Sequence, residues 1–179
     1  TAEYWGQHLT ADHITSIKDR MLGVTGDRDA LVIKDIFSGL RHLFPTRDKS
    51  AKETVDCIRR FAGDKKIMKL YSDNSGEISV ALKELSIPAQ NSIPGVPQSN
   101  AVVERLNGDI VSNTRVSLAI AGLPACFWPW AAQHYCFMEN THFDANNPSP
   151  WCKTHGSEFA GYRIPFGSRV AFKPVETKD

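Results

Sequence analysis

Three carboxylates, Asp12, Asp73 and Glu104, stand at positions from which they could act together. Asp12 lies in the middle of an expected strand, Asp73 directly follows another strand, and Glu104 falls in the first turns of a long expected helix. Side chains from a central strand, the end of its neighbour and an adjacent helix can converge. Mg²⁺ prefers such oxygen ligands, and two ions about 3.5–4 Å apart can clamp both reacting oxygens of a phosphoryl displacement. The arrangement favours metal-dependent phosphodiester chemistry.

Each of these residues taken alone has an ordinary structural explanation. Asp12 could end a strand at a turn, Asp73 could open a helix, and Glu104 could be an exposed helical glutamate. Asp35, in the segment IKDIFSG, competes with Asp12 for the first position. Only the combination indicates a site, and the choice between Asp12 and Asp35 stays open.

Periodicity and turn chemistry predict the elements that must position these side chains. Strands are expected within 5–17, 30–37, 40–46, 66–72 and 87–90, and helices within 48–61, 74–85, 99–122 and 126–142. This order predicts a mixed α/β layer with a hairpin at its edge. We expect a core domain over residues 1–145. Residues 146–179 hold Pro148, Pro150 and Pro165, followed by a strand-like RVAFKP, and we expect them to form a C-terminal extension that packs on or follows the core.

Composition places the chain among globular proteins without identifying its partner. The 179 residues are 41% hydrophobic and 23% charged, enough for one domain with its own core. No apolar run approaches the roughly 20 residues of a membrane span, so no membrane partner is expected. The net charge of +1 does not indicate a nucleic-acid binder. Four cysteines without a CxxC pair favour a reducing compartment, and a start at Thr1 suggests a piece of a longer chain.

Two longer motifs carry a specific resemblance. Residues 72–78 (SDNSGEI), and residues 96–105 (VPQSNAVVER) with Asn107, resemble the DNGGEF and TPQQNGVAERKN motifs of retroviral and LTR-retrotransposon integrases. Downstream, AGLP at 121–124, Phe127-Trp128 and Asn140 resemble a block of the copia-type integrases. Residues 165–168 (PFGS) are similar to a strand that follows the core of these proteins. The resemblance covers roughly residues 5–175.

The resemblance implies an RNase H-like fold, a mixed five-stranded sheet flanked by helices. It also implies that Asp12, Asp73 and Glu104 are catalytic residues and hold two Mg²⁺ or Mn²⁺ ions. The expected activity is that of a polynucleotidyl transferase and endonuclease, which processes the 3′ ends of element DNA and joins them to target DNA. The expected partners are element-end DNA and target DNA. Polar and basic residues near the third motif are expected to contact DNA: Gln98, Ser99, Asn100, Arg105, Asn107 and Arg115.

Departures from the family pattern keep two other functions open. Ala101 stands where glycine is usual, and Leu106 and the Gly108-Asp109 pair stand where basic residues are usual. The interval between Asp73 and Glu104 is also somewhat short for the family. One alternative is a domesticated or inactive core that acts as a DNA-binding or oligomerisation module. The other is a nuclease of the same fold that cuts without joining.

The segment 126–142 has aromatic residues on more than one face of its expected helix. A purely core-facing helix shows a single apolar stripe, so part of this aromatic surface is expected to pair with another subunit. We expect a homodimer or higher oligomer that uses this helix and the one over about 50–62. The resemblance further implies assembly in cytoplasmic particles and action on chromosomal DNA in the nucleus.

Overall fold

The computed structural model describes residues 2–15, 22–73, 75–91, 101–144 and 146–171. Along the chain the elements are β1 (Leu9–Thr15), β2 (Asp29–Asp35), β3 (Arg41–Thr46), α1 (Ala51–Ala62), β4 (Leu70–Ser72), α2 (Gly76–Glu84), β5 (Ala89–Asn91), α3 (Ala101–Ala121), the 3-10 turn η2 (Ala125–Phe127), α4 (Trp128–Thr141) and α5 (Pro150–His155). None of the helices in these ranges is long and apolar enough to cross a lipid bilayer.

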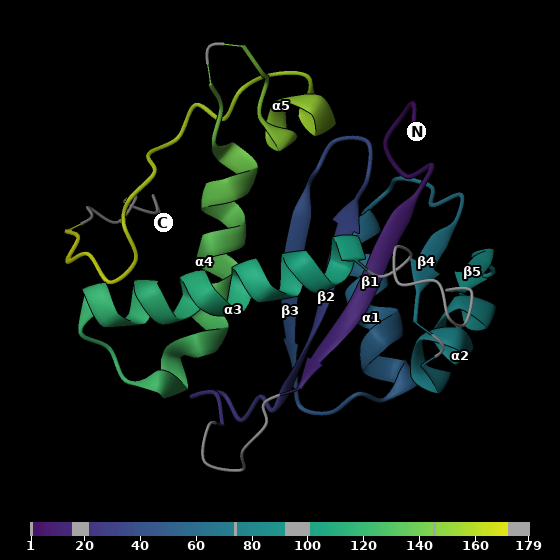
Figure 1. The fold of residues 1–179 in the computed structure, drawn as a ribbon, viewed down its shortest axis with the longest axis horizontal. Helices are drawn as coiled ribbons and strands as arrows, with labels where there is room; N and C mark the ends of the chain where they lie inside the picture. The colour runs from purple at the N-terminus through teal and green to yellow at the C-terminus, as the bar shows by residue number, and fades with distance from the viewer. Residues whose placement is uncertain (1, 16–21, 74, 92–100, 145, 172–179) are drawn as a thin grey trace, which may run out of the picture.

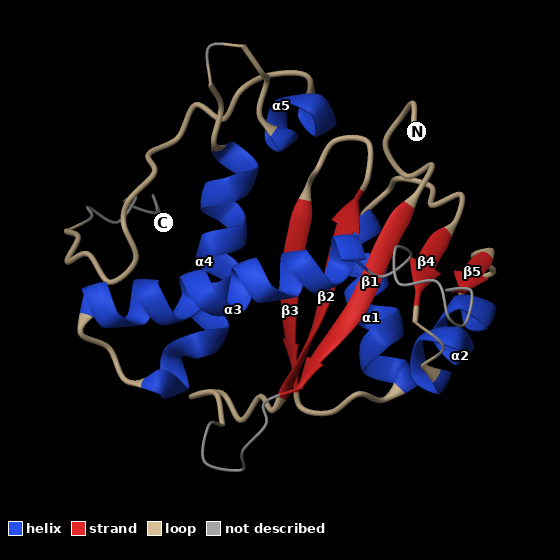
Figure 2. Cartoon of the chain, in the orientation of Figure 1, coloured by secondary structure: helices blue, strands red, loops and turns tan. Residues whose placement is uncertain are grey.

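The strands form one mixed five-stranded sheet in the order β3-β2-β1-β4-β5 (Figures 1 and 2). β1 pairs antiparallel with β2, and β2 pairs antiparallel with β3, which gives the hairpin expected from the sequence. β1 pairs parallel with β4, and β4 pairs parallel with β5. The sheet and its flanking helices confirm the predicted fold class, with β1 at the centre of the sheet.

Helices cover the two faces of the sheet and bury two separate hydrophobic clusters. On one face, Leu9 and Leu31 pack with residues of α1 and α2, including Ile58 and Ile78. On the other face, Val32 and its neighbours pack with residues of α3 and α4. Figure 1 shows α3 crossing in front of β2 and β3 toward β1, with α1 and α2 behind the sheet. The face under α3 is therefore the one that can combine strand and helix side chains.

The C-terminal segment differs from its sequence prediction in two ways. Helix α5 was not expected, because the prolines and the strand-like RVAFKP were the only features noted in this segment. Ser149 caps its first turn by accepting a hydrogen bond from the Cys152 N–H, and Gly156 ends it in the left-handed region. Residues 169–171 of the strand-like RVAFKP are not in a strand, and the rest of that stretch lies outside the described residues. The C-terminal segment instead packs on α4, with Phe137 edge-on to Phe159 at 5.1 Å.

Asp35 holds the turn between β2 and β3. Its side chain is fully buried and accepts hydrogen bonds from the Ser38 N–H and hydroxyl, both at 2.7 Å. It also accepts from the Gly6 N–H at 3.0 Å, which ties the N-terminal segment to the hairpin. Three buried donors thus depend on one carboxylate, and their loss of a partner would be costly.

We predict that Asp35→Ala lowers the free energy of unfolding by at least about 2 kcal/mol, because it leaves buried donors without an acceptor. Urea unfolding followed by circular dichroism measures the change. Asp64→Ala is the matched control, because Asp64 is exposed after α1 and its removal should leave the unfolding midpoint close to that of the wild type. Equal midpoints for both variants would contradict a structural role for Asp35.

Candidate active site

Asp12 lies on the central strand, on the face of the sheet covered by α3. Its register partner is Val32, which belongs to the hydrophobic cluster under α3 and α4. Its neighbours along β1, Ala11 on one side and His13 on the other, project to the opposite face because strand side chains alternate. Asp12 is half-buried, so its carboxylate remains within reach of solvent while α3 lies over part of it.

Two donors fix the orientation of the Asp12 carboxylate. The His13 N–H donates to Oδ1 at 2.8 Å, and the side-chain amide of Asn107 in α3 donates to Oδ2 at 2.8 Å. The second bond links the central strand directly to the helix. A carboxylate only accepts, so Asn107 must present its NH₂ group to Asp12. Its own Oδ1 is buried and has no hydrogen-bond partner among the described residues.

Electrostatics at Asp12 oppose its ionisation. Burial raises the pKa of the Asp12 carboxyl above its usual value, and the nearby charge of Asp73 raises it further. The hydrogen bonds from His13 and Asn107 lower this pKa, as does the charge of Lys49, but they do not cancel the increase. Two carboxylates that interact in this way repel each other unless a cation or a proton neutralises one of them.

Asp73 follows the last residue of β4, the strand parallel to β1. Its Oδ1 accepts a hydrogen bond from the Ser75 N–H at 3.1 Å, immediately before α2 begins. The parallel register pairs Thr10 with Tyr71, so Asp12 and Asp73, each two residues further along, come within electrostatic range although they are far apart in the chain. The predicted convergence of Asp12 and Asp73 is therefore present in the fold.

Glu104 is linked to Asp12 only indirectly, through Asn107. It lies in the first turn of α3 and is exposed, one helical turn before Asn107. Residues three apart on a helix are neighbours on its surface, so Glu104 lies next to the residue that holds Asp12. Among the described residues, however, no group of three or more histidine, cysteine, aspartate or glutamate side chains is arranged to hold a metal ion. The metal-ligand role of Asp12, Asp73 and Glu104 stays a prediction.

Asp35 stands apart from these carboxylates. It pairs in register with Leu9, which packs with the cluster on the α1 face, and its oxygens are used by the hairpin turn. The two aspartates that sequence reasoning could not separate thus have different surroundings. Asp12 is half-buried beside another carboxylate, whereas Asp35 is buried among donors.

The predicted DNA contacts divide into three groups. Gln98, Ser99 and Asn100 lie outside the described residues. Arg105 and Arg115 are exposed on α3, where their side chains are accessible. Asn107 has its donor occupied by Asp12, a contact that sequence reasoning missed. The signal for it was the spacing of three residues between Glu104 and Asn107, which places both on one helical surface.

Comparison with known proteins identifies relatives over part of the chain. No protein-family model matches it. It is 40% identical over 81 residues to the retrovirus-related Pol polyprotein from transposon TNT 1-94 of Nicotiana tabacum, a match over 42% of this chain. It is 30% identical over 127 residues to the corresponding polyprotein from transposon RE2 of Arabidopsis thaliana, over 67% of this chain. The matches span only 6% and 9% of these two relatives.

Solved structures show where the fold occurs. The catalytic core domain of BIV integrase superposes with a TM-score of 0.58 at 20% identity, covering 82% of this chain and 91% of that one. A chain of the simian T-cell lymphotropic virus intasome, in complex with PP2A regulatory subunit B56 gamma, superposes with a TM-score of 0.65 at 20% identity. That match covers 98% of this chain and 61% of the other. By sequence this chain is a homologue of a segment of retrotransposon Pol polyproteins, and its fold is the RNase H-like fold of retroviral integrase catalytic cores.

Proposed function

We propose that this chain is the catalytic core of a retroelement integrase. The proposed reaction is metal-dependent cleavage at the 3′ ends of element DNA, followed by joining of those ends to target DNA in the nucleus. The observation that carries the proposal is the proximity of the Asp12 and Asp73 carboxylates, whose charges interact. A half-buried carboxylate whose pKa is raised by burial and by a second carboxylate is a typical feature of functional sites.

The donor chemistry of the site fits a divalent cation. In the proposed site, Asp12 and Asp73 would present hard oxygens, and Glu104, one helical turn before Asn107 in α3, would supply a third. Asn107 contributes a buried Oδ1 that has no hydrogen-bond donor among the described residues. A cation there would remove the repulsion that now raises the pKa of Asp12. When bound, Mg²⁺ ions supply charge neutralisation at the attacking and leaving oxygens of the phosphodiester.

The protein residues themselves mainly hold and orient. The His13 N–H and the Asn107 amide keep both oxygens of Asp12 in fixed directions. The Ser75 N–H does the same for one oxygen of Asp73. The carboxylates act in their ionised form, so no side chain here is assigned as a proton carrier and no covalent intermediate with the protein is required. Asn107 is a positioning residue, because it acts through Asp12.

The same assays would distinguish two other functions from the proposed one. A nuclease of this fold would release cut strands from labelled element-end DNA but form no joined product with a target duplex. An inactive DNA-binding module would bind both DNAs and cut neither with Mg²⁺ or Mn²⁺. The proposed function therefore requires both metal-dependent cleavage and joining by the unmodified chain.

We predict that Glu104→Gln reduces cleavage and joining by at least about a hundredfold, since a metal-bound carboxylate contributes several kcal/mol of transition-state stabilisation. The amide keeps the volume of the side chain and loses its charge. Cleavage of end-labelled duplex DNA, resolved on a denaturing gel, measures the rate.

The matched control is Glu84→Gln, the same chemical change at an exposed position in α2 on the other face of the sheet. It should cut and join at the wild-type rate. Full activity in Glu104→Gln would remove Glu104 from the proposed metal ligands.

A second prediction concerns Asp12 in the absence of metal. Its pKa is raised in the folded chain, so at pH above that pKa the ionised carboxylate makes folding less favourable. This cost disappears as the pH falls through the folded pKa toward the ordinary value of 3.8. Asp12→Asn should therefore raise the free energy of unfolding at neutral pH in EDTA, and the gain should vanish in acid. The new amide can keep its hydrogen bonds, because Asn107 can turn its unpaired Oδ1 toward it.

The Asp12→Asn variant also distinguishes the loss of carboxylate repulsion from the binding of a metal ion. Millimolar Mg²⁺ or Mn²⁺ should raise the melting temperature of the wild type by binding the native state, and should not raise that of Asp12→Asn. Thermal unfolding at several pH values, with and without metal, provides both measurements. A variant that is less stable than the wild type at neutral pH, or equally stabilised by metal, would argue against this site.

We also propose that the chain forms a homodimer through the start of α4. Phe137 is covered by Phe159, so the aromatic surface near the end of this helix is used within the chain. Trp130 is 45% exposed, and Leu22 and Val24, in the segment that contacts Cys126, are 40% and 49% exposed. The Val24 N–H donates to the Cys126 carbonyl at 2.8 Å, which holds these side chains near the start of the helix. The exposed positions of α1 are charged, so the apolar support for a contact comes from α4.

We predict that Trp130→Glu shifts the chain toward monomer without unfolding it, because a charge is tolerated on an exposed surface but not inside an apolar contact. Sedimentation velocity at tens of micromolar measures the mass. Tyr162→Glu is the control, because Tyr162 is 92% exposed in the C-terminal segment and should not change association. A monomeric wild type at that concentration would contradict the dimer.

A further inference from the structure

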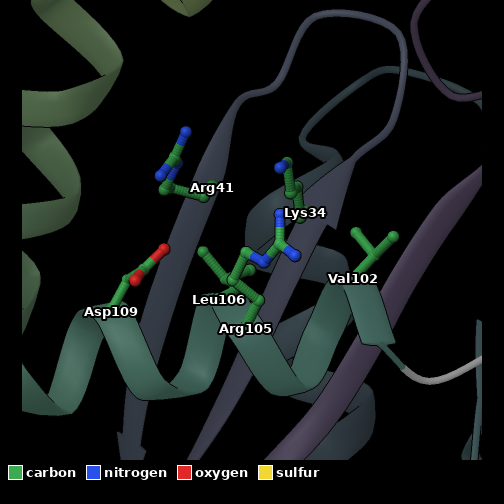
Figure 3. Close-up of a pocket in the computed structure, with 6 residues that line it drawn as sticks. All are labelled: Lys34, Arg41, Val102, Arg105, Leu106 and Asp109. Atoms are coloured by element: carbon green, nitrogen blue, oxygen red, sulfur yellow. The ribbon is translucent and has the colours of Figure 1, made fainter.

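A basic pocket lies beside the candidate active site, between α3 and the β2–β3 hairpin. Its volume is about 340 Å³. Figure 3 shows Lys34 and Arg105 extending into the same space above α3, with Arg41 and Asp109 toward the other end. The pocket is lined by Lys34, Arg41, Val102, Arg105, Leu106 and Asp109.

The position of Lys34 connects this pocket to Asp12. Lys34 pairs in register with Thr10, and Asp12 pairs with Val32 two residues further along β1. Side chains two apart on a strand share a face, so Lys34 and Asp12 project from the same side of the sheet, roughly 7 Å apart along the strand direction. On the helix, Arg105 directly follows Glu104. The pocket therefore borders the candidate site on both the strand side and the helix side.

The cationic groups of the pocket are incompletely neutralised. Lys34 is half-buried, and neither its ammonium group nor the guanidinium of Arg105 makes a hydrogen bond or ion pair with another described residue. Burial lowers the pKa of Lys34, and the charge of Arg41 lowers it further. Asp109 acts in the opposite direction, but it forms no ion pair with Lys34.

Arg41 is held in place and still has binding capacity. Asn140 of α4 fixes its backbone by accepting from the Arg41 N–H at 2.9 Å and donating to the Arg41 carbonyl at 2.6 Å. Its guanidinium pairs with Glu139 at 3.4 Å through one terminal nitrogen. Its Nε is buried and has no acceptor within the described residues. Three cations thus face two carboxylates, Asp109 and Glu139, and a buried donor is left over.

We propose that this pocket holds a backbone phosphate of the DNA strand that enters the candidate active site. A phosphate is a small anion that accepts hydrogen bonds on several oxygens, which matches an ammonium and two guanidinium groups around one cavity. The volume leaves room for bridging water. The assignment rests on the proposed function for its ligand, since the strand that it positions is the one to be cut. Such a contact fixes the register of DNA without reading its sequence.

The test measures the affinity of the intact chain for a fluorescent DNA duplex in EDTA, over a range of potassium chloride concentrations. Each phosphate neutralised contributes about 0.9 to the slope of log affinity against log salt concentration. Lys34→Met, which keeps the buried stem, and Arg105→Gln should each weaken binding several-fold at low salt and reduce this slope by about 0.9. Lys34→Arg should retain both affinity and slope.

Lys83→Gln is the matched control, because it removes one positive charge from an exposed position of α2 on the other face of the sheet. Its slope should equal that of the wild type. Wild-type slopes in Lys34→Met and Arg105→Gln would overturn the proposal, and so would an equal decrease in Lys83→Gln, which would indicate a general charge effect. Arg105 is exposed, so Arg105→Gln decides the question if Lys34→Met does not fold.

A cleavage assay on the same duplex separates this proposal from the proposed function. A wild type that binds DNA with a Lys34-dependent slope but cuts nothing with Mg²⁺ or Mn²⁺ would leave the phosphate pocket standing and remove the catalytic proposal. Conversely, if the wild type cuts DNA but Lys34→Met and Arg105→Gln keep the wild-type slope, the catalytic proposal stands and the phosphate pocket is removed.

Discussion

The hydrogen bond between Asn107 and Asp12 joins the two parts of the molecule on which the site depends. Asp12 belongs to the central strand and Asn107 to the helix that crosses it, 95 residues later in the chain. Burial under this helix raises the pKa of Asp12, and the end of the parallel strand β4 brings the second negative charge. The fold therefore maintains a repulsion between carboxylates and opposes it with two hydrogen-bond donors and the charge of Lys49. A divalent cation at this place would relieve that repulsion.

The mixed sheet is what makes this arrangement possible. The parallel pairing of β1 with β4 places Asp73 near Asp12, while the antiparallel hairpin of β2 and β3 brings Lys34 and Arg41 to the same face. α3 then lies across that face and adds Glu104 and Arg105 from consecutive positions. The strand pairing and the position of α3 therefore place the carboxylates and the cationic side chains in adjacent regions of one face of the sheet.

Sequence reasoning predicted the elements better than the contacts between them. Periodicity and caps placed the strands and long helices close to their observed limits, because those signals are local. Only Leu70–Ser72 of the predicted strand 66–72 pairs in the sheet, since the Met68 N–H bonds to Gly6 outside the ladder. Helix α5 was missed because the prolines drew attention away from its boundary signals, although the Ser149-Pro150 start and Gly156 are ordinary helix boundaries. Asp12 and Asp35 could not be separated, since their difference lies in strand register and burial.

The net charge of +1 was uninformative for a related reason. It sums groups that the fold separates, so a nearly neutral chain can still present a local excess of cations beside a local excess of anions. In the proposed function, a DNA strand that approaches Asp12 and Asp73 would meet repulsion there, whereas Lys34, Arg41 and Arg105 in the adjacent pocket would attract its phosphates. Three carboxylates contribute −3 to the total, and two divalent cations would add +4, changing +1 to +5. If the pocket holds a DNA phosphate as proposed, its contribution is greatest before metal is bound, because it then supplies the positive potential that the carboxylates lack.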